Sequence, residues 1–306
     1  MKRREKRKQN GRNDRVTTII LVCVLLAGIV ILAYPSVSNW WNHRLTAGVV
    51  STYDSAVDDM SEEDYSVWFE AAEAYNEALN AVGSAAAITS PELVDEDYWD
   101  ILDITGTGVM GYITIEKIDV QLPIYHGTDV NVLQVGAGHL EGTSLPVGGE
   151  STHSVISAHR GLPSALLFTN LNQLEVGDTF TITVLNRVMT YEVDQISIVE
   201  PDEVENLYIE EGKDYCTLMT CTPYGINTHR LLVRGVRVEN ADSTLIHVTA
   251  EAERISPLLA APVLAVPMVL FLLIWVFWDS RRVRKKRIEE TEKDEDEKGS
   301  GDMDVP

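Results

Sequence analysis

Two uncharged apolar runs lie near the two ends of the chain. Residues 16–33 and residues 257–278 contain no charged side chain. At a rise of about 1.5 Å per residue, runs of this length match the ~30 Å hydrocarbon core of a bilayer. Trp40 and Trp41 follow the first run, as expected of an interfacial anchor rather than of a small-x-small cleavage site. We therefore expect two transmembrane helices, with a removed signal peptide as the alternative for the first.

The segment between these runs begins with a helical pattern. Over residues 46–86, apolar residues recur three and four positions apart, and the second of two such sets ends just before Gly83. The first set contains Val49, Tyr53, Val57 and Met60, and the second contains Tyr65, Trp68, Phe69, Ala72, Tyr75, Leu79 and Val82. This spacing predicts amphipathic helices that pack on the domain that follows.

From Val109 onward the pattern changes to short runs separated by Gly, Pro and Asn. The clearest predicted strands are residues 110–115, 153–158, 178–185, 190–199, 214–220 and 230–238. Short helical patches are expected between them at residues 131–135 and 164–171. Several short strands with so little helix favour a closed barrel or a sandwich, so we predict a mainly β fold.

Basic residues flank the two apolar runs on their outer sides. Residues 1–15 contain eight Lys or Arg against two acidic residues, and residues 281–287 contain six Lys or Arg. The positive-inside rule then places both termini in the cytoplasm and residues 35–256 outside the cell membrane. The net charge of the chain is −22, and the outer segment carries 35 acidic residues against nine basic ones. Such a surface repels phosphate, which argues against nucleic acid as a partner.

Cys221 is the first candidate for chemistry, because it ends a predicted strand and precedes the polar loop 222–229. A thiol at a strand end is placed for exposure, which a nucleophile needs. Arg230 opens the next strand, and a guanidinium there can stabilise a thiolate and a carbonyl oxygen that becomes negative. His159 follows the strand 153–158 and can activate the thiol or protonate a leaving amine. On spacing alone, a cysteine acting as a small buried hydrophobe and a histidine bonded to backbone remain alternatives.

Longer segments around these residues carry a family resemblance. SVISAHRGLPSALLFTNL (154–171) and TLMTCTPYGINTHRLLVRG (217–235) resemble the two signature segments of sortases. GYITIEKIDVQLPIYHGT (111–128) and GHLEGTSLPVGGEST (138–152) resemble the sortase framework. The resemblance is densest with class C, the pilus-assembling sortases, and it covers residues 98–238 closely. The flanking helices and both membrane segments also resemble the class C architecture.

This resemblance implies an eight-stranded β-barrel and a cysteine transpeptidase. A cysteine matching Cys221 attacks the Thr–Gly bond of an LPXTG-type sorting signal, and a histidine matching His159 serves as acid and then as base. An arginine matching Arg230 holds the substrate and stabilises the oxyanion. An amine, in class C usually a pilin lysine, then resolves the thioacyl-enzyme, so pilins or other surface proteins are the expected partners. The alternatives are a sortase that uses a peptidoglycan amine as acceptor and a catalytically silent binding module.

The resemblance is incomplete in one region. Class C sortases usually carry a lid in which an Asp-Pro-aromatic motif covers the cysteine, and this chain contains no Asp-Pro dipeptide. The corresponding region, residues 85–99, offers Asp97, Tyr98 and Trp99 in a different arrangement. Either these residues form a lid, or the two rings pack this segment against the barrel. We predict a weakly closed or absent lid.

The other candidate residues predict no further chemistry. Cys216 lies five residues before Cys221, so the two side chains face opposite sides of a strand, and we do not expect a redox pair. Cys23 lies inside the first membrane run. The histidines lack metal-ligand spacing, so we expect no metal site and no cofactor.

These observations divide the chain into seven segments, and they make the membrane one of its partners. In order, we expect a cytoplasmic basic segment (1–15), a signal-anchor (16–33), a helical extension with the possible lid (46–100), the sortase-type barrel (101–240), a linker (241–256), a transmembrane helix (257–278) and a charged cytoplasmic tail (279–306).

Overall fold

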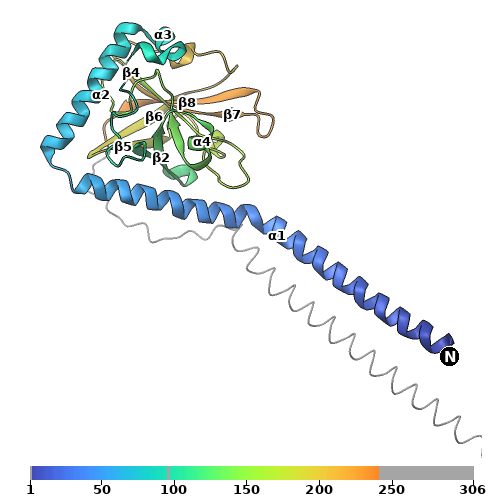
Figure 1. The fold of residues 1–306 in the computed structure, drawn as a ribbon. Coiled ribbons are helices and arrows are strands. Elements are labelled where there is room, and N and C mark those ends of the chain that lie inside the picture. The colour runs from blue at the N-terminus through green and yellow to red at the C-terminus, as the bar shows by residue number, and fades with distance from the viewer. Residues whose placement is uncertain (1, 95–96, 241–306) are drawn as a thin grey trace, which may run out of the picture. The chain divides into compact units, whose positions relative to one another are not determined.

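The computed structural model of the chain describes residues 2–94 and 97–240. The expected linker 241–256, second transmembrane helix 257–278 and tail 279–306 lie outside the described residues. Within those ranges, eight strands close into a barrel, and helices precede it (Figure 1). The predicted barrel is therefore confirmed, and the sandwich alternative is wrong.

The barrel follows the order β1-β2-β3-β4-β7-β8-β6-β5, and β5 pairs again with β1. Two neighbouring pairs, β2–β3 and β4–β7, are parallel, and the other pairs are antiparallel. The strands are β1 (Val109–Ile115), β2 (Val120–His126), β3 (Ala137–His139), β4 (Thr152–Ser157), β5 (Thr179–Val184), β6 (Arg187–Val199), β7 (Asp214–Thr222) and β8 (His229–Val238).

Among the described residues, four α-helices accompany the barrel: α1 (Lys2–Asp58), α2 (Glu62–Val82), α3 (Ser84–Thr89) and α4 (Val130–Val135). From Ile20 onward, α1 contains a stretch long and apolar enough to cross a membrane, as expected for residues 16–33. A capping box starts α2, because the Ser61 hydroxyl accepts from the Asp64 N–H while the Asp64 carboxylate accepts from the Ser61 N–H. This break separates the two sets of helical spacing that the sequence shows.

The helices pack on the barrel through polar as well as apolar contacts. From α1, the Tyr53 hydroxyl donates to the Met110 carbonyl oxygen (3.0 Å) and accepts from the Leu185 N–H (2.9 Å). From α2, the buried Asn76 amide accepts from the Leu145 N–H (2.7 Å). The predicted amphipathic helices are thus confirmed, and both pack on the barrel.

The strands β4, β7 and β8 have two different faces. Cys216, Leu218 and Val233 point into the barrel core, where they are fully buried. The residues between them point outward, as strand alternation requires. Met219 and Leu232 there pack in a second, small apolar cluster with four further side chains, and Ile88 of α3 covers it; the four are Leu140, Val155, Val199 and Leu207.

The predicted helical patch at residues 164–171 is wrong, whereas the patch at residues 131–135 is confirmed as α4. The backbone of residues 160–170 uses partners outside a helical ladder: the Gly161 N–H donates to the Thr169 hydroxyl (3.0 Å), and the Phe168 N–H donates to the His159 carbonyl oxygen (3.1 Å). We call residues 160–170 the His159 loop.

Candidate active site

Cys221 lies at the end of β7, directly opposite Arg230 in the antiparallel pairing with β8. Residues paired in this way share one face of the sheet, so the thiol and the guanidinium are neighbours. Cys221 is half-buried, whereas Cys216 is fully buried on the other face. Burial raises the pKa of the Cys216 thiol well above its usual range. Of the two β7 cysteines, Cys221 is therefore the one that can act as a nucleophile.

His159 lies on the other side of Cys221, just beyond the end of β4, which runs parallel to β7. Two hydrogen bonds bracket it. The Thr220 hydroxyl donates to the carbonyl oxygen of Ala158 (2.7 Å), and Nη1 of Arg160 donates to the Thr222 hydroxyl (3.1 Å). His159 is therefore level with Cys221, and the structure brings all three predicted residues together at one end of the barrel.

Arg230 and Arg234 both lie on β8, but their side chains have different hydrogen-bond partners. Nε and Nη2 of Arg234 donate to both carboxylate oxygens of Asp194 (3.1 and 2.7 Å), and Nη1 donates to Glu210 (3.2 Å). Arg230 donates to the His229 carbonyl oxygen (3.3 Å), and no described carboxylate forms an ion pair with it. In so acidic a domain, an arginine left without a carboxylate is free to bind substrate oxygens.

The Cys221 thiol and the His159 imidazole, like the Arg230 guanidinium, can bind groups from outside the protein. In the part of the chain that the structure describes, neither group has a hydrogen-bond partner. Both side chains are half-buried, which leaves them accessible to a bound peptide. The arrangement can therefore supply a nucleophile, a proton donor and an anion-binding group to one carbonyl carbon.

Tyr98 and Trp99, the candidate lid residues, contact the ends of β2 and β3. The Tyr98 hydroxyl accepts from the Gly127 N–H (3.0 Å) and donates to Nδ1 of His139 (2.9 Å), and its ring is buried. The Trp99 ring packs beside His126 and over Gly127. Asp97 precedes the two rings, next to residues 95–96, which are outside the described residues. These contacts favour the alternative that this segment packs against the barrel.

His139 itself is a structural residue. It is fully buried, and its Nε2 donates to the Ser144 carbonyl oxygen (2.8 Å). Burial lowers the pKa of His139 to about 3, so the imidazole is neutral at physiological pH.

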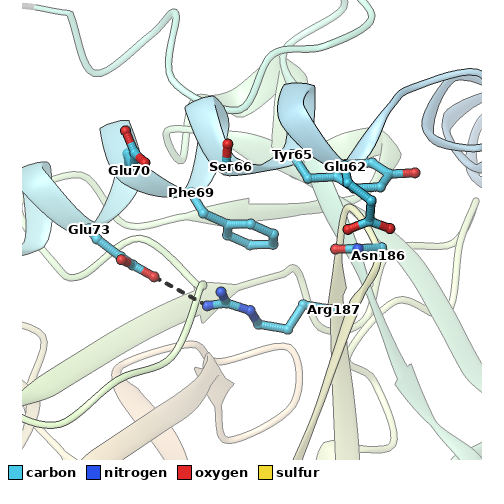
Figure 2. Close-up of a pocket in the computed structure, with 8 residues that line it drawn as sticks. All are labelled: Glu62, Tyr65, Ser66, Phe69, Glu70, Glu73, Asn186 and Arg187. Atoms are coloured by element: carbon cyan, nitrogen blue, oxygen red, sulfur yellow. Dashed lines mark hydrogen bonds and ion pairs between the residues drawn. The ribbon is translucent and has the colours of Figure 1, made fainter.

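A surface hollow of about 480 Å³ lies between α2 and the turn from β5 to β6 (Figure 2). The Arg187 guanidinium already fills part of it, stacked 3.8 Å from the Phe69 ring centroid and 3.5 Å from the Glu73 carboxylate. Arg187 begins β6, whereas the residue of β6 that pairs with Arg230 is Val199, at its other end. The hollow is therefore separate from the Cys221 site.

Comparison with known proteins agrees with this geometry. The sortase domain family model matches residues 113–238. A crystal structure of sortase C1 from Streptococcus agalactiae is 52% identical in sequence with a TM-score of 0.60, and the match covers 63% of this chain and 99% of that one. The chain belongs to the sortase family. The matched region includes His159, Cys221 and Arg230.

Two further relatives place this sortase within its family. Sortase C of Streptococcus pneumoniae is 45% identical with a TM-score of 0.57, and the match covers 63% of this chain and 97% of that one. Sortase D of Bacillus subtilis is 31% identical over 131 residues, which are 42% of this chain and 63% of that protein. This sortase thus spans less than two thirds of that curated relative, whereas it covers the two class C structures almost completely. The predicted resemblance to class C is confirmed.

Proposed function

We propose that this sortase is a membrane-anchored cysteine transpeptidase, which cleaves an LPXTG-like sorting signal and transfers it to an amine. The observation that carries the proposal is the placement of Cys221 between His159 and an Arg230 that has no carboxylate partner among residues 2–94 and 97–240. A structural cysteine would not need a guanidinium without a described carboxylate partner on its own face.

In the first half of the reaction, the Cys221 thiolate attacks the carbonyl carbon of the substrate threonine, and a C–S bond forms. The carbonyl oxygen becomes negative and accepts hydrogen bonds from Arg230. Protonated His159 gives its proton to the glycine nitrogen as the C–N bond breaks. The products are a thioacyl-enzyme on Cys221 and a free glycine amine.

In the second half, an acceptor amine attacks the thioester carbon while neutral His159 removes its proton. The new C–N bond forms, the C–S bond breaks, and Cys221 leaves as the thiolate. We propose a pilin lysine as the acceptor, because the Streptococcus pneumoniae sortase C that this chain resembles is described in terms of pilin substrate specificity. The product would be an isopeptide bond between pilin subunits.

The same proposal places the barrel outside the cell. The apolar part of α1 suggests membrane anchoring. We propose that residues 257–278 form a second membrane helix, because a basic cluster follows them as one precedes the first. Both termini would then be cytoplasmic.

The test is to incubate the full chain with a sorting-signal peptide and a lysine-bearing pilin domain, and to identify products by mass spectrometry. We expect a thioacyl adduct on Cys221 and an isopeptide product. A product formed only with peptidoglycan-type amines would replace the pilin acceptor by the cell wall. A thiol probe that labels wild type and Cys221→Ala equally would instead favour a silent binding module.

A further inference from the structure

The His159 loop is tied at its far side to a single turn of α1. The Ser38 hydroxyl donates to the Ser164 carbonyl oxygen (3.0 Å), and Nδ2 of Asn42 donates to the same oxygen (2.5 Å). Oδ1 of Asn39 accepts from the Leu166 N–H (2.9 Å). Ser38 and Asn42 are four residues apart and so lie on one helix face. One helical turn thus supplies three hydrogen bonds to two loop backbone groups.

The near side of the same loop is bonded to the end of β7 and to residues that flank the loop. Nη1 of Arg160 reaches Thr222, the residue after Cys221, and Nη2 reaches Asn172 (2.8 Å). The Phe168 N–H bonds the carbonyl oxygen of His159 itself. Because the imidazole has no hydrogen-bond partner of its own among the described residues, the backbone of this loop decides where the ring points.

The supporting turn of α1 lies where the helix would leave the bilayer. Asn39 is six residues beyond Ala33, the last residue of the apolar run, which is about 9 Å along the helix axis. Trp40 and Trp41 lie in the same turn, and the Arg44 guanidinium stacks on the Trp40 ring at 4.8 Å. Tryptophans with a basic neighbour are typical of the interface between lipid and water.

We propose that Ser38, Asn39 and Asn42 are positioning residues for His159, so that the membrane anchor itself supports the catalytic loop. The inference rests on the proposed function, because it assigns the loop a role in proton transfer by His159. These hydrogen bonds between α1 and the His159 loop also keep the active site close to the membrane surface.

The two asparagines allow a matched experiment, because one accepts a hydrogen bond and the other donates one. Asn39→Asp keeps the oxygen that the Leu166 N–H needs. Asn42→Asp removes the donor and places a carboxylate against the Ser164 carbonyl oxygen. The two variants have the same size and charge and differ by three positions on one helix. Asn80→Ala is a distant control, because its amide donates to the Ser151 carbonyl oxygen (2.9 Å), away from the site.

The measurement uses the full chain in phospholipid nanodiscs with a sorting-signal peptide. For Asn42→Asp we expect kcat to fall about ten- to hundredfold with KM nearly unchanged, and the pH profile of kcat to shift, because a misplaced imidazole transfers its proton poorly. Asn39→Asp and Asn80→Ala should stay within about twofold of wild type. Equal kcat values and pH profiles for the two Asp variants would overturn the proposal.

Amide hydrogen exchange separates this inference from the proposed function. The Leu166 N–H should be protected in wild type and in Asn39→Asp, and should exchange at least about tenfold faster in Asn39→Ala. If turnover persists in Cys221→Ala, the proposed function fails whatever the exchange result. If the Leu166 N–H exchanges equally fast in all three proteins, the proposal that α1 positions the His159 loop is wrong, while the proposed chemistry at Cys221 is unaffected.

Discussion

Histidine, cysteine and arginine occur twice along β4, β7 and β8, counting the residues just beyond the strand ends. The first set is His153, Cys216 and Arg234, and the second is His159, Cys221 and Arg230. In the first set, Cys216 is buried in the barrel core, and both polar side chains already have partners. Nδ1 of His153 donates to the Tyr208 carbonyl oxygen (2.9 Å), its Nε2 accepts from the Thr217 hydroxyl (2.7 Å), and Arg234 pairs with Asp194 and Glu210.

In the second set the same three residue types are left open to a substrate. Cys221 and His159 are half-buried and have no hydrogen-bond partner among the described residues, and Arg230 bonds its neighbour's carbonyl oxygen. The difference shows that the presence of these three residue types on the same strands does not make an active site. What distinguishes the two sets is whether the polar groups are already satisfied by the fold.

The largest expected effect separates the two cysteines. Cys221→Ala should abolish turnover, because no other half-exposed thiol on the barrel can form the acyl-enzyme. Cys216→Ala should keep activity within a few-fold, since it removes a buried sulfur from the core and costs about 1 kcal/mol in unfolding free energy. Peptide cleavage assays and the mass of the acyl-enzyme measure both variants. Loss of activity in the Cys216 variant alone would contradict the assignment.

The next effect separates the two arginines. Arg230→Lys should lower kcat by about 10²–10³, or ~3–4 kcal/mol, because a lysine is a point donor and cannot reproduce the planar fork at a developing oxyanion. Arg234→Lys should instead lower the unfolding free energy by about 1 kcal/mol with nearly normal kcat, because it weakens the pair with Asp194. Kinetics and urea unfolding distinguish the outcomes. Near-normal turnover of Arg230→Lys would reduce Arg230 to a source of general positive potential.

A smaller effect concerns the buried histidines. Burial lowers the pKa of His153 to about 4 and that of His139 to about 3, whereas an unfolded histidine has a pKa of about 6.5. The unfolded chain therefore binds protons first, and the free energy of unfolding should fall as the pH drops below about 6.5. The slope should reach about 1.4 kcal/mol per pH unit for each histidine.

Urea unfolding between pH 5 and pH 7 measures this slope while most carboxylates remain ionised. In His153→Gln about half of the slope should disappear. An unchanged slope would show that His153 is protonated in the folded state, contrary to its hydrogen bonds with Tyr208 and Thr217.

The smallest effect on the reactivity of Cys221 is expected at the candidate lid. Tyr98→Phe leaves the Gly127 N–H and Nδ1 of His139 without a partner, which should lower the unfolding free energy by about 1–3 kcal/mol. The rate at which a small reagent alkylates Cys221 should change less than about tenfold in Tyr98→Phe and in Trp99→Ala, which corresponds to ~1.4 kcal/mol of gating. A much larger acceleration would identify a true lid.

The effects of these point variants are easier to interpret than those of a deletion of residues 85–96. That deletion would also remove Ala87, which is fully buried, and Ile88, which packs on the small apolar cluster beside β7. A change in alkylation rate would then mix gating with loss of packing.

Sequence patterns predicted those strands and helices whose hydrophobic spacing agrees with their place in the folded chain. Two strands were missed for identifiable reasons: β2 contains Pro123, which removes a backbone donor, and β3 is three residues long with a central glycine. The helix expected at residues 164–171 does not form, because the loop backbone bonds His159, Thr169 and α1 instead.

The three site residues were predictable from strand ends and signature segments. The residues that hold the His159 loop in place were not. His159, Cys221 and Arg230 stand at the boundaries of patterned strands, so the sequence indicates them. Arg160 and Asn39 gave no comparable signal, because their partners lie elsewhere in the chain, up to 127 positions away for Asn39 and Leu166. Nor does the sequence tell Arg234 from Arg230, since only the folded chain shows which arginine meets a carboxylate.

The hairpin of β7 and β8 has a consequence for how this enzyme would fail. Cys221 and Arg230 face each other across one short loop, so their contact is local and survives as long as the hairpin does. His159 comes from β4, and it reaches the thiol only while the parallel β4–β7 seam is closed. If that seam opened, Cys221 would keep Arg230 beside it and would lose His159, which is the acid in the proposed reaction. The enzyme would then hold its substrate without completing the exchange.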